Sequence, residues 1–225
     1  CDLASNLALH DVATRTQLMT HSLADGAVSA LAIAPHAELI AAGTEQGDIF
    51  LLDGITLAPR HHRSGMASVR ALAFAAAAPR LAAAGDDGVV QLLDTSTGAA
   101  LGTFAGESGA ISAIAIDAAA TALFVAAADG SIAIIDATTG TVRPRIDGDG
   151  DAIVDLRCDA AGRRLLLRNE ISMVQFVDVA SGAVTHRIGG PLRSIDAVDL
   201  DPGGDVAVLG HVDGRIEWVD ASGRS

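Results

Sequence analysis

One glycine-rich stretch carries the residues from which a calcium site could be built. Asp147, Asp149 and Asp151 alternate with glycines, and alternate carboxylates on such a turn can converge on one hard cation. A calcium loop of this type also needs Gly at its sixth position and Glu at its twelfth, where this chain has Ala152 and Cys158. We therefore expect residues 147–151 to form a solvated loop without a metal.

The histidines offer a second possible metal site. His61 and His62 are adjacent, but neighbouring residues of a strand point to opposite faces. No Cys or carboxylate stands at ligand spacing from this pair, so we expect a surface loop here. The other histidines are scattered along the chain without a ligand pattern: His10, His21, His36, His186 and His211.

Motifs for covalent or cofactor chemistry are missing from the sequence. In the stretch 106–109 the glycine follows Ser108 immediately, so it does not match the G-x-S-x-G elbow of hydrolases. There is no phosphate-binding loop, dinucleotide fingerprint, C-x-x-C pair or haem-attachment motif. We predict a non-enzymatic protein without a cofactor.

Aspartate recurs along the chain at almost constant spacing. Six copies follow short apolar runs at intervals of 42, 41, 42, 42 and 42 residues: Asp11, Asp53, Asp94, Asp136, Asp178 and Asp220. One active site does not need six copies. We expect these closing aspartates to accept backbone N–H groups from the turn that follows each of them.

The elements that position these aspartates are clearest between residues 111 and 146. Residues 111–116 alternate apolar and small side chains, 123–127 form a short apolar run, and 132–136 form a third strand. Asp129-Gly130 is a tight hairpin signal, because Gly accepts a positive φ. Residues 141–146 form a fourth strand, and Pro144 places that strand at a sheet edge because proline lacks an N–H donor.

The same unit is repeated along the whole chain. Units start near residues 28, 69, 111, 153 and 195, after a partial unit at 1–23. A period of about 42 residues with four short strands per period is typical of a β-propeller blade. We predict one all-β domain, 1–225, with about five and a half four-stranded antiparallel blades. Because the chain begins and ends within a unit, we expect a slice of a six- or seven-bladed propeller from a longer protein.

At these residues the sequence resembles the WD-repeat family. The pattern of Asp-Gly, alternating apolar residues and a closing Asp is carried by 87–94, 129–136 and 213–220, and more loosely by 46–53. The family's Trp before the closing Asp is absent, and the only tryptophan, Trp218, stands one place earlier. The Gly-His pair before each unit is also absent. The blades must then be held by apolar packing and ladder hydrogen bonds instead of the family's side-chain relay.

Charge and hydropathy exclude some classes of function. The 225 residues carry a net charge of −13, and an acidic domain repels phosphate backbones, so we expect no nucleic-acid binding. Half of the residues are hydrophobic, which is ample for a core. The uncharged apolar run at 118–128 is far shorter than the roughly 20 residues of a membrane span.

The two cysteines do not form a disulfide framework. Cys158 lies at the end of a predicted strand and Cys1 is the first residue. We favour a cytoplasmic protein. A bacterial lipoprotein anchored through Cys1 is the alternative interpretation.

The resemblance implies a scaffold that binds a protein or a peptide. By analogy the binding face is built from the loops before each first strand and from the hairpins between second and third strands. Here those positions carry Gln46, Arg70, Asp87, Asp129, Glu170, Arg193 and Asp213. This mostly acidic face suits a basic partner. The alternative is the propeller part of an enzyme or electron-transfer protein whose chemistry lies outside these residues.

Overall fold

The chain folds into repeated antiparallel sheets. The structure, a computed structural model, describes residues 6–11, 13–23, 26–105, 109–190, 195–222 and 224. Within these residues it contains 21 β-strands and no helix. The strands form six sheets, of which four have four strands, the first has two and the last has three.

Each sheet takes its strands from one continuous stretch of sequence. The first two sheets contain β1 (Asn6–Asp11) and β2 (Thr16–Ser22), then β3 (Val28–Ile33), β4 (Leu39–Thr44), β5 (Ile49–Asp53) and β6 (Pro59–Arg63). The third contains β7 (Val69–Phe74), β8 (Arg80–Gly85), β9 (Val89–Asp94) and β10 (Ala100–Ala105). The fourth contains β11 (Ile111–Ile116), β12 (Ala122–Ala127), β13 (Ile132–Asp136) and β14 (Val142–Ile146). The fifth contains β15 (Ile153–Cys158), β16 (Arg164–Asn169), β17 (Met173–Asp178) and β18 (Val184–Gly189). The last contains β19 (Ile195–Leu200), β20 (Val206–His211) and β21 (Ile216–Asp220).

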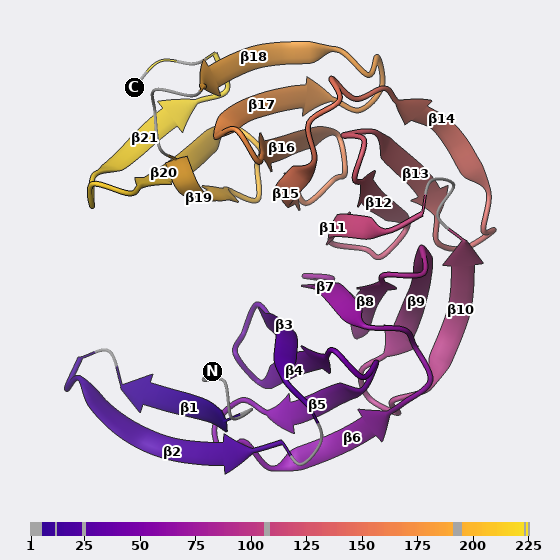
Figure 1. The fold of residues 1–225 in the computed structure, drawn as a ribbon, viewed down its shortest axis with the longest axis vertical. Coiled ribbons are helices and arrows are strands. Elements are labelled where there is room, and N and C mark those ends of the chain that lie inside the picture. The colour runs from indigo at the N-terminus through magenta and orange to yellow at the C-terminus, as the bar shows by residue number, and fades with distance from the viewer. Residues whose placement is uncertain are drawn as a thin grey trace.

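The six sheets follow one another around an open arc (Figure 1). The first strands β3, β7, β11, β15 and β19 lie on the inner side, and the fourth strands β6, β10, β14 and β18 lie on the outer side. The first and last sheets are separated by a gap at the left of the view, so the described residues do not close into a ring. The prediction of an all-β repeat of four-stranded antiparallel sheets is confirmed.

The strands between residues 111 and 146 agree closely with the sequence pattern. The expected run 123–127 corresponds to β12, which begins one residue earlier, and the expected 141–146 corresponds to β14, which begins one residue later. Pro144 lies in β14, and within the described residues β14 pairs only with β13, at the outer edge of its sheet. The edge position predicted from the missing N–H is therefore confirmed.

The hairpins between second and third strands share one backbone conformation. Gly130 has φ of 79° in the β12–β13 hairpin, as the Asp-Gly signal predicted. The fifth sheet has no glycine in its hairpin, and Ser172 takes the left-handed conformation there, with φ of 61°. The Asn169 carboxamide supports that turn, because its Oδ1 accepts the Met173 N–H at 2.8 Å.

Apolar side chains pack between successive sheets. Phe124 and Ile134 of the fourth sheet share a buried cluster with Leu156, Leu165 and Leu167 of the fifth. A similar cluster joins the fifth sheet to the last, through Leu166, Val174, Phe176, Ile195, Val198, Ala207, Leu209 and Val219. The core is therefore a series of inter-sheet layers, as expected for blades held by apolar packing.

Main-chain hydrogen bonds also link neighbouring sheets. They join the turns between first and second strands: Ala77 N–H donates to Ala118 at 2.7 Å, Ala118 to Ala160 at 3.0 Å, and Ala160 to Pro202 at 2.9 Å. Each donor belongs to the earlier sheet and each acceptor to the next one. This series, the turn relay, fixes the spacing of the last four sheets at one end of their strands.

Across the part of the chain that the structure describes, there is no helix long and apolar enough to cross a membrane.

Candidate functional site

Five of the seven predicted interaction residues lie at the turns between second and third strands. Gln46, Asp87, Asp129 and Asp213 are exposed and occupy equivalent hairpins in four sheets. Arg193 lies outside the described residues.

Glu170 does not occupy the position that was assigned to it. The residue equivalent to Asp129 in the fifth sheet is Ile171, 42 positions later. Glu170 instead matches Glu45 and Asp86. All three donate their backbone N–H to the carbonyl of the residue immediately before the first strand of their own sheet: Ala152, Ala27 and Ser68. The row of equivalent acidic hairpin residues is therefore interrupted at Ile171. Glu170 stands one position earlier in the turn, so its side chain lies at a different place from those of the row.

The hairpin carboxylates have a local structural role. In Asp87, Asp129 and Asp213, Oδ1 accepts the N–H of the residue two positions later, at 3.1, 3.0 and 3.0 Å. The Ser131 hydroxyl, followed by the Ser131 N–H, lowers the pKa of Asp129. Asp129 is therefore ionised at neutral pH and presents an exposed negative charge.

Arg70 reduces the acidity of this face. Its guanidinium forms an ion pair with the Asp86 carboxylate, and that contact raises the pKa of Arg70. Both side chains are exposed or half-buried at the hairpin end of the third sheet. The structure thus brings one predicted cation together with an acidic residue that the sequence prediction did not include.

The six closing aspartates form the turns that were expected of them. Asp136 Oδ1 accepts the N–H groups of Thr138 and Thr139, both at 2.9 Å. The same contact, with an N–H two or three residues later, recurs at Asp11, Asp53, Asp94, Asp178 and Asp220. The predicted use of these carboxylates as turn acceptors is confirmed.

The same turns lower the pKa of every closing aspartate. The N–H groups of Thr139 and Thr138 lower the pKa of Asp136, and the Arg60 guanidinium is the largest cause for Asp53. In Asp94 burial raises the pKa, but the N–H groups of the turn outweigh it, so the pKa of Asp94 is also lowered. The pKa values of Asp11, Asp178 and Asp220 are lowered as well. The largest cause is a hydrogen bond from Thr14, Ser181 and Ser222, respectively.

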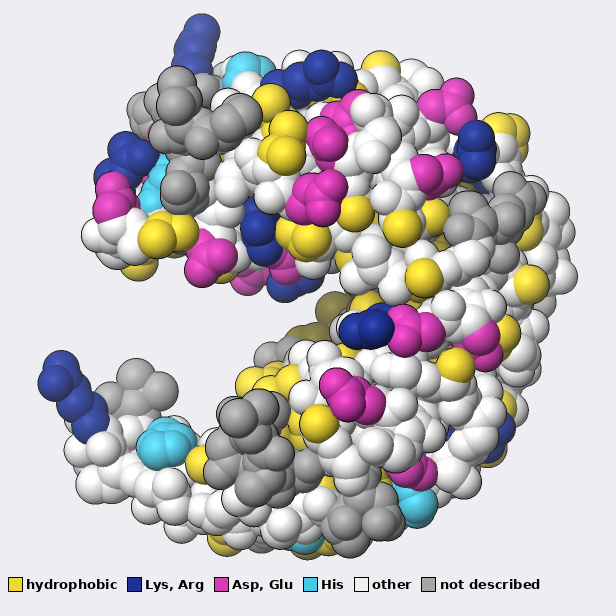
Figure 2. All heavy atoms as spheres, in the orientation of Figure 1, with side chains coloured by type: hydrophobic (Ala, Val, Ile, Leu, Met, Phe, Trp, Pro, Cys, Tyr) yellow, Lys and Arg dark blue, Asp and Glu magenta, His cyan; other side chains and the backbone are white. Residues whose placement is uncertain are grey.

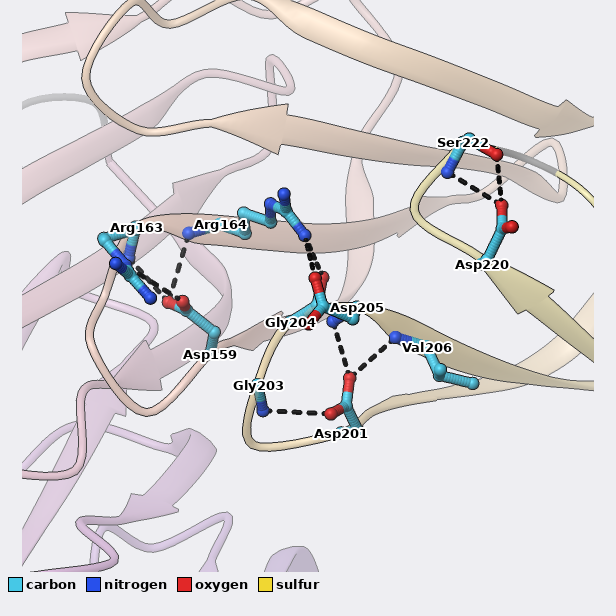
Figure 3. Close-up of polar contacts among 10 residues, drawn as sticks. All are labelled: Asp159, Arg163, Arg164, Asp201, Gly203, Gly204, Asp205, Val206, Asp220 and Ser222. Atoms are coloured by element: carbon cyan, nitrogen blue, oxygen red, sulfur yellow. Dashed lines mark hydrogen bonds and ion pairs between the residues drawn. The ribbon is translucent and has the colours of Figure 1, made fainter.

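A second group of aspartates was missed at the turns between first and second strands. Asp159 Oδ1 accepts the N–H groups of Arg163 and Arg164, and Asp201 Oδ1 those of Asp205 and Val206 (Figure 3). Asp117 does the same in the fourth sheet. The spacing of 42 residues between these three aspartates is the signal that would have revealed them.

One of these turns also connects two sheets through side chains. The Arg164 guanidinium of β16 donates to the Gly204 carbonyl at 2.9 Å and to Asp205 Oδ1 at 2.6 Å in the β19–β20 turn (Figure 3). The contact lies beside the last bond of the turn relay, between Ala160 and Pro202.

The histidine pair lies in a strand, so the prediction of a surface loop is wrong. His61 and His62 lie in β6, paired with Leu51 and Phe50 of β5. His62 Nε2 is 2.9 Å from Asp48 Oδ1, and the His62 ring stacks on Phe50. The sequence missed this carboxylate because the strand pairing, and not sequence spacing, brings it close.

The carboxylates of residues 147–151 contact neighbouring polar groups. Asp149 Oδ2 accepts from Gln175 Nε2 at 2.8 Å, and Asp151 Oδ2 accepts from Asn169 Nδ2 at 3.3 Å. Both donors belong to the fifth sheet, so the loop links the fourth sheet to the fifth. Among the described residues, no three His, Cys, Asp or Glu side chains are grouped as a metal ion would require.

The inner strands of five sheets line one central depression of about 470 Å³. One wall is apolar, formed by Leu31, Ile33, Leu72 and Phe74. The opposite wall carries Arg157 and Asp199, whose Nε and Oδ1 atoms are 3.4 Å apart. Figure 2 shows hydrophobic side chains on the inner side of the arc where β3 lies in Figure 1, and acidic side chains spread over several sheets.

Comparison with protein-family models finds no match, and a search of curated proteins finds none either.

Proposed function

We propose that this chain is a WD-repeat-like β-propeller module that binds a protein or peptide and is not itself an enzyme. The observation that carries the proposal is the central depression, which five sheets build together from their first strands. An apolar wall beside a charged pair suits a peptide segment, whose side chains supply both kinds of contact.

Exposure of the apolar wall supports a binding role. Leu31 and Ile33 are 49% and 60% exposed, and both lie on β3, at the inner side of the arc. Exposed apolar groups rimmed by polar ones are typical of interaction surfaces. The net charge of −13 and the exposed hairpin aspartates favour a partner with basic residues.

The cysteine in the depression has the properties of a structural residue. Burial raises the pKa of the Cys158 thiol to about 12. Its Sγ–H donates to the Ile116 carbonyl of the preceding sheet at 3.0 Å. The thiol therefore stays protonated at neutral pH and is a poor nucleophile.

A peptide array of basic and acidic segments would test the proposal. Wild type should retain basic peptides with apolar residues, and Ile33→Asp should lose most of that binding because the charge interrupts the apolar wall. A triple variant with Asn at positions 87, 129 and 213 keeps the turn acceptors and removes three charges, so it should mainly slow association at low salt. Equal binding by all three proteins at low and high salt would contradict the proposal.

A further inference from the structure

The outer edge of the third sheet differs from the outer edges of the other four-stranded sheets. Its fourth strand, β10, lies in the middle of the chain, on the side of the arc opposite the gap (Figure 1). Among the described residues β10 pairs only with β9, so its other side presents backbone N–H and C=O groups. Another strand can add to such an edge unless charges or prolines oppose it.

Three of the four fourth strands carry charges or prolines of this kind. The fourth, β10, has the sequence ALGTFA and carries neither. Among these described strands, the edge of the third sheet is therefore the unprotected one. The residues that protect the others are Pro59, Arg60 and Arg63 in β6, Arg143, Pro144 and Arg145 in β14, and Arg187 in β18.

Leu101 stands where the second sheet has an arginine. Arg60 follows its closing aspartate, Asp53, by seven residues, and the two side chains form an ion pair. In the third sheet the closing aspartate, Asp94, is paired instead with Arg80 of β8, at 2.8 Å. Position 101, seven residues after Asp94, needs no cation and carries an apolar side chain that is 50% exposed.

A neutral groove of about 510 Å³ runs beside this edge. It lies between residues 101–105 of β10 and the β13–β14 turn of the next sheet. The Phe104 ring lies beside two glycines of the groove: a Cβ would be 2.8 Å from the ring at Gly102 and 3.6 Å from it at Gly140. None of the described residues that line the groove is charged.

This neutrality favours a second copy of the chain over a charged partner. Each copy carries a net charge of −13, and like charges repel, so two copies can approach closely only where the surface is locally neutral. The groove also lacks the charges that would attract a basic or an acidic segment. A second copy supplies a strand of the same length with the same uncharged edge.

We propose that two copies of this protein pair through β10. The two strands lie antiparallel about a two-fold axis, so the two third sheets become one continuous sheet of eight strands. Leu101 of each copy packs against the edge strand of the other. Such a contact uses the same surface on both copies and closes at two. It lies on the outer side of the arc and leaves the central depression free.

Sedimentation of the whole protein over a range of concentrations tests the proposal. We expect the mass to rise from that of one chain to that of two. Hydrogen exchange of the β10 amides should slow over the same range, while exchange of the β14 amides should not change. High salt should strengthen the dimer, because salt screens the repulsion between the two net charges. A dimer held by opposite charges would weaken instead.

Arginine variants identify the edge. Leu101→Arg, which copies the arrangement of Arg60, and Thr103→Arg on the same strand should each weaken the association at least about tenfold, because two cations then face each other. The control is Val184→Arg, which adds the same charge to a 37% exposed residue of β18 and should dimerise like wild type. All three should melt like wild type at concentrations at which every protein is monomeric.

Three results would overturn the proposal. The first is a monomer at every concentration and salt level. The second is a dimer that neither β10 variant weakens, since it would use another surface. The third is exchange of the β10 amides that does not depend on protein concentration.

Discussion

Two pairs of neighbouring sheets reach the same fold with different side chains. The alanine sheets, β3–β6 and β7–β10, have Ala41 and Ala82 in the middle of their second strands. The sheets β11–β14 and β15–β18 have Phe124 and Leu166 at the same position. We call them the aspartate sheets, because Asp117 and Asp159 begin the turns between their first and second strands. All four residues are fully buried.

The neighbouring sheet accounts for the difference in size. Ala82 shares a cluster with Ile114, Ile116 and Leu123 of the following sheet, so large side chains there occupy the space that alanine leaves. Phe124 itself occupies the space between its own sheet and the fifth. The volume of a layer is thus shared between two sheets, and one position can vary widely if its neighbour compensates.

The turns between first and second strands differ as well. The aspartate sheets have Asp117 and Asp159 as turn acceptors, where the alanine sheets have Ala34 and Ala75. The backbone bond that closes the turn is the same in both kinds, since Ala34 donates to Leu39 as Asp159 donates to Arg164. The carboxylate therefore reinforces a turn that the backbone forms without it.

Shortening the large buried side chain should have the largest effect. Phe124→Ala should lower the free energy of unfolding by about 3–5 kcal/mol, through lost burial and the cavity left behind. Ala82→Gly, at the same position of an alanine sheet, should cost about 1–2 kcal/mol, from one methyl group and added chain entropy. Denaturant titration measures both. Equal losses would mean that the two layers do not divide their volume as described.

Removing a turn aspartate should have an intermediate effect. Asp159→Ala leaves the N–H groups of Arg163 and Arg164 without their acceptor in a partly buried turn, at a cost of about 1–3 kcal/mol in unfolding free energy. Asp159→Asn keeps an acceptor oxygen and should recover most of that loss. If Asn and Ala destabilise the protein equally, the hydrogen bonds are not the cause.

The reverse exchange sharpens the comparison. Ala34→Asp should lie within about 1 kcal/mol of wild type, because Ala37 has the same left-handed φ as Ala120 and the turn can present its N–H groups. Ala75→Asp should cost about 1–3 kcal/mol, because Pro79 has no N–H and the Arg80 N–H already binds the Ala78 carbonyl. Thermal melts of the two variants side by side test this.

Acid should weaken both kinds of sheet alike. The closing aspartates occur in both, and their folded pKa values lie below the ordinary 3.8. A lowered folded pKa contributes stability that is fully present above about pH 4 and is lost as pH falls through the folded pKa. Asp136→Asn should therefore reduce the loss of stability between pH 5 and pH 2 relative to wild type. An unchanged pH profile, measured by urea titration at several pH values, would contradict this.

The smallest effect is expected at the glycine-free hairpin. Ser172→Gly should raise stability by at most about 1 kcal/mol, because glycine adopts the left-handed φ freely but has a more flexible unfolded chain. The control is Gly130→Ser in the preceding sheet, whose added Cβ would lie 2.6 Å from the Asp151 carbonyl oxygen. That variant should lose at least about 1 kcal/mol. A gain in the control would show that the two hairpins are not equivalent.

The sequence predicted what depends on local pattern. Strand alternation, Asp-Gly turns and the closing aspartates were all readable, because their contacts lie within a few residues. His61 and His62 were misread because their pairing with β5 and Asp48 depends on strand register. The exposure of Trp218 could not be predicted at all, since its buried equivalents, such as Phe176, have the same local pattern and differ only in being covered by another sheet.

The turn relay has a consequence for how the protein is made. Each donor precedes its acceptor by about one repeat, as Ala118 precedes Ala160 and Ala160 precedes Pro202. On the ribosome, each donor N–H group therefore has no partner carbonyl until the next repeat has been synthesised. Synthesis of one repeat takes about 2–8 s at about 5–20 residues per second. Sheets that join during synthesis therefore do so from the N-terminal end onward, and a translational pause between repeats prolongs the time for which a turn lacks its hydrogen bond to the next sheet.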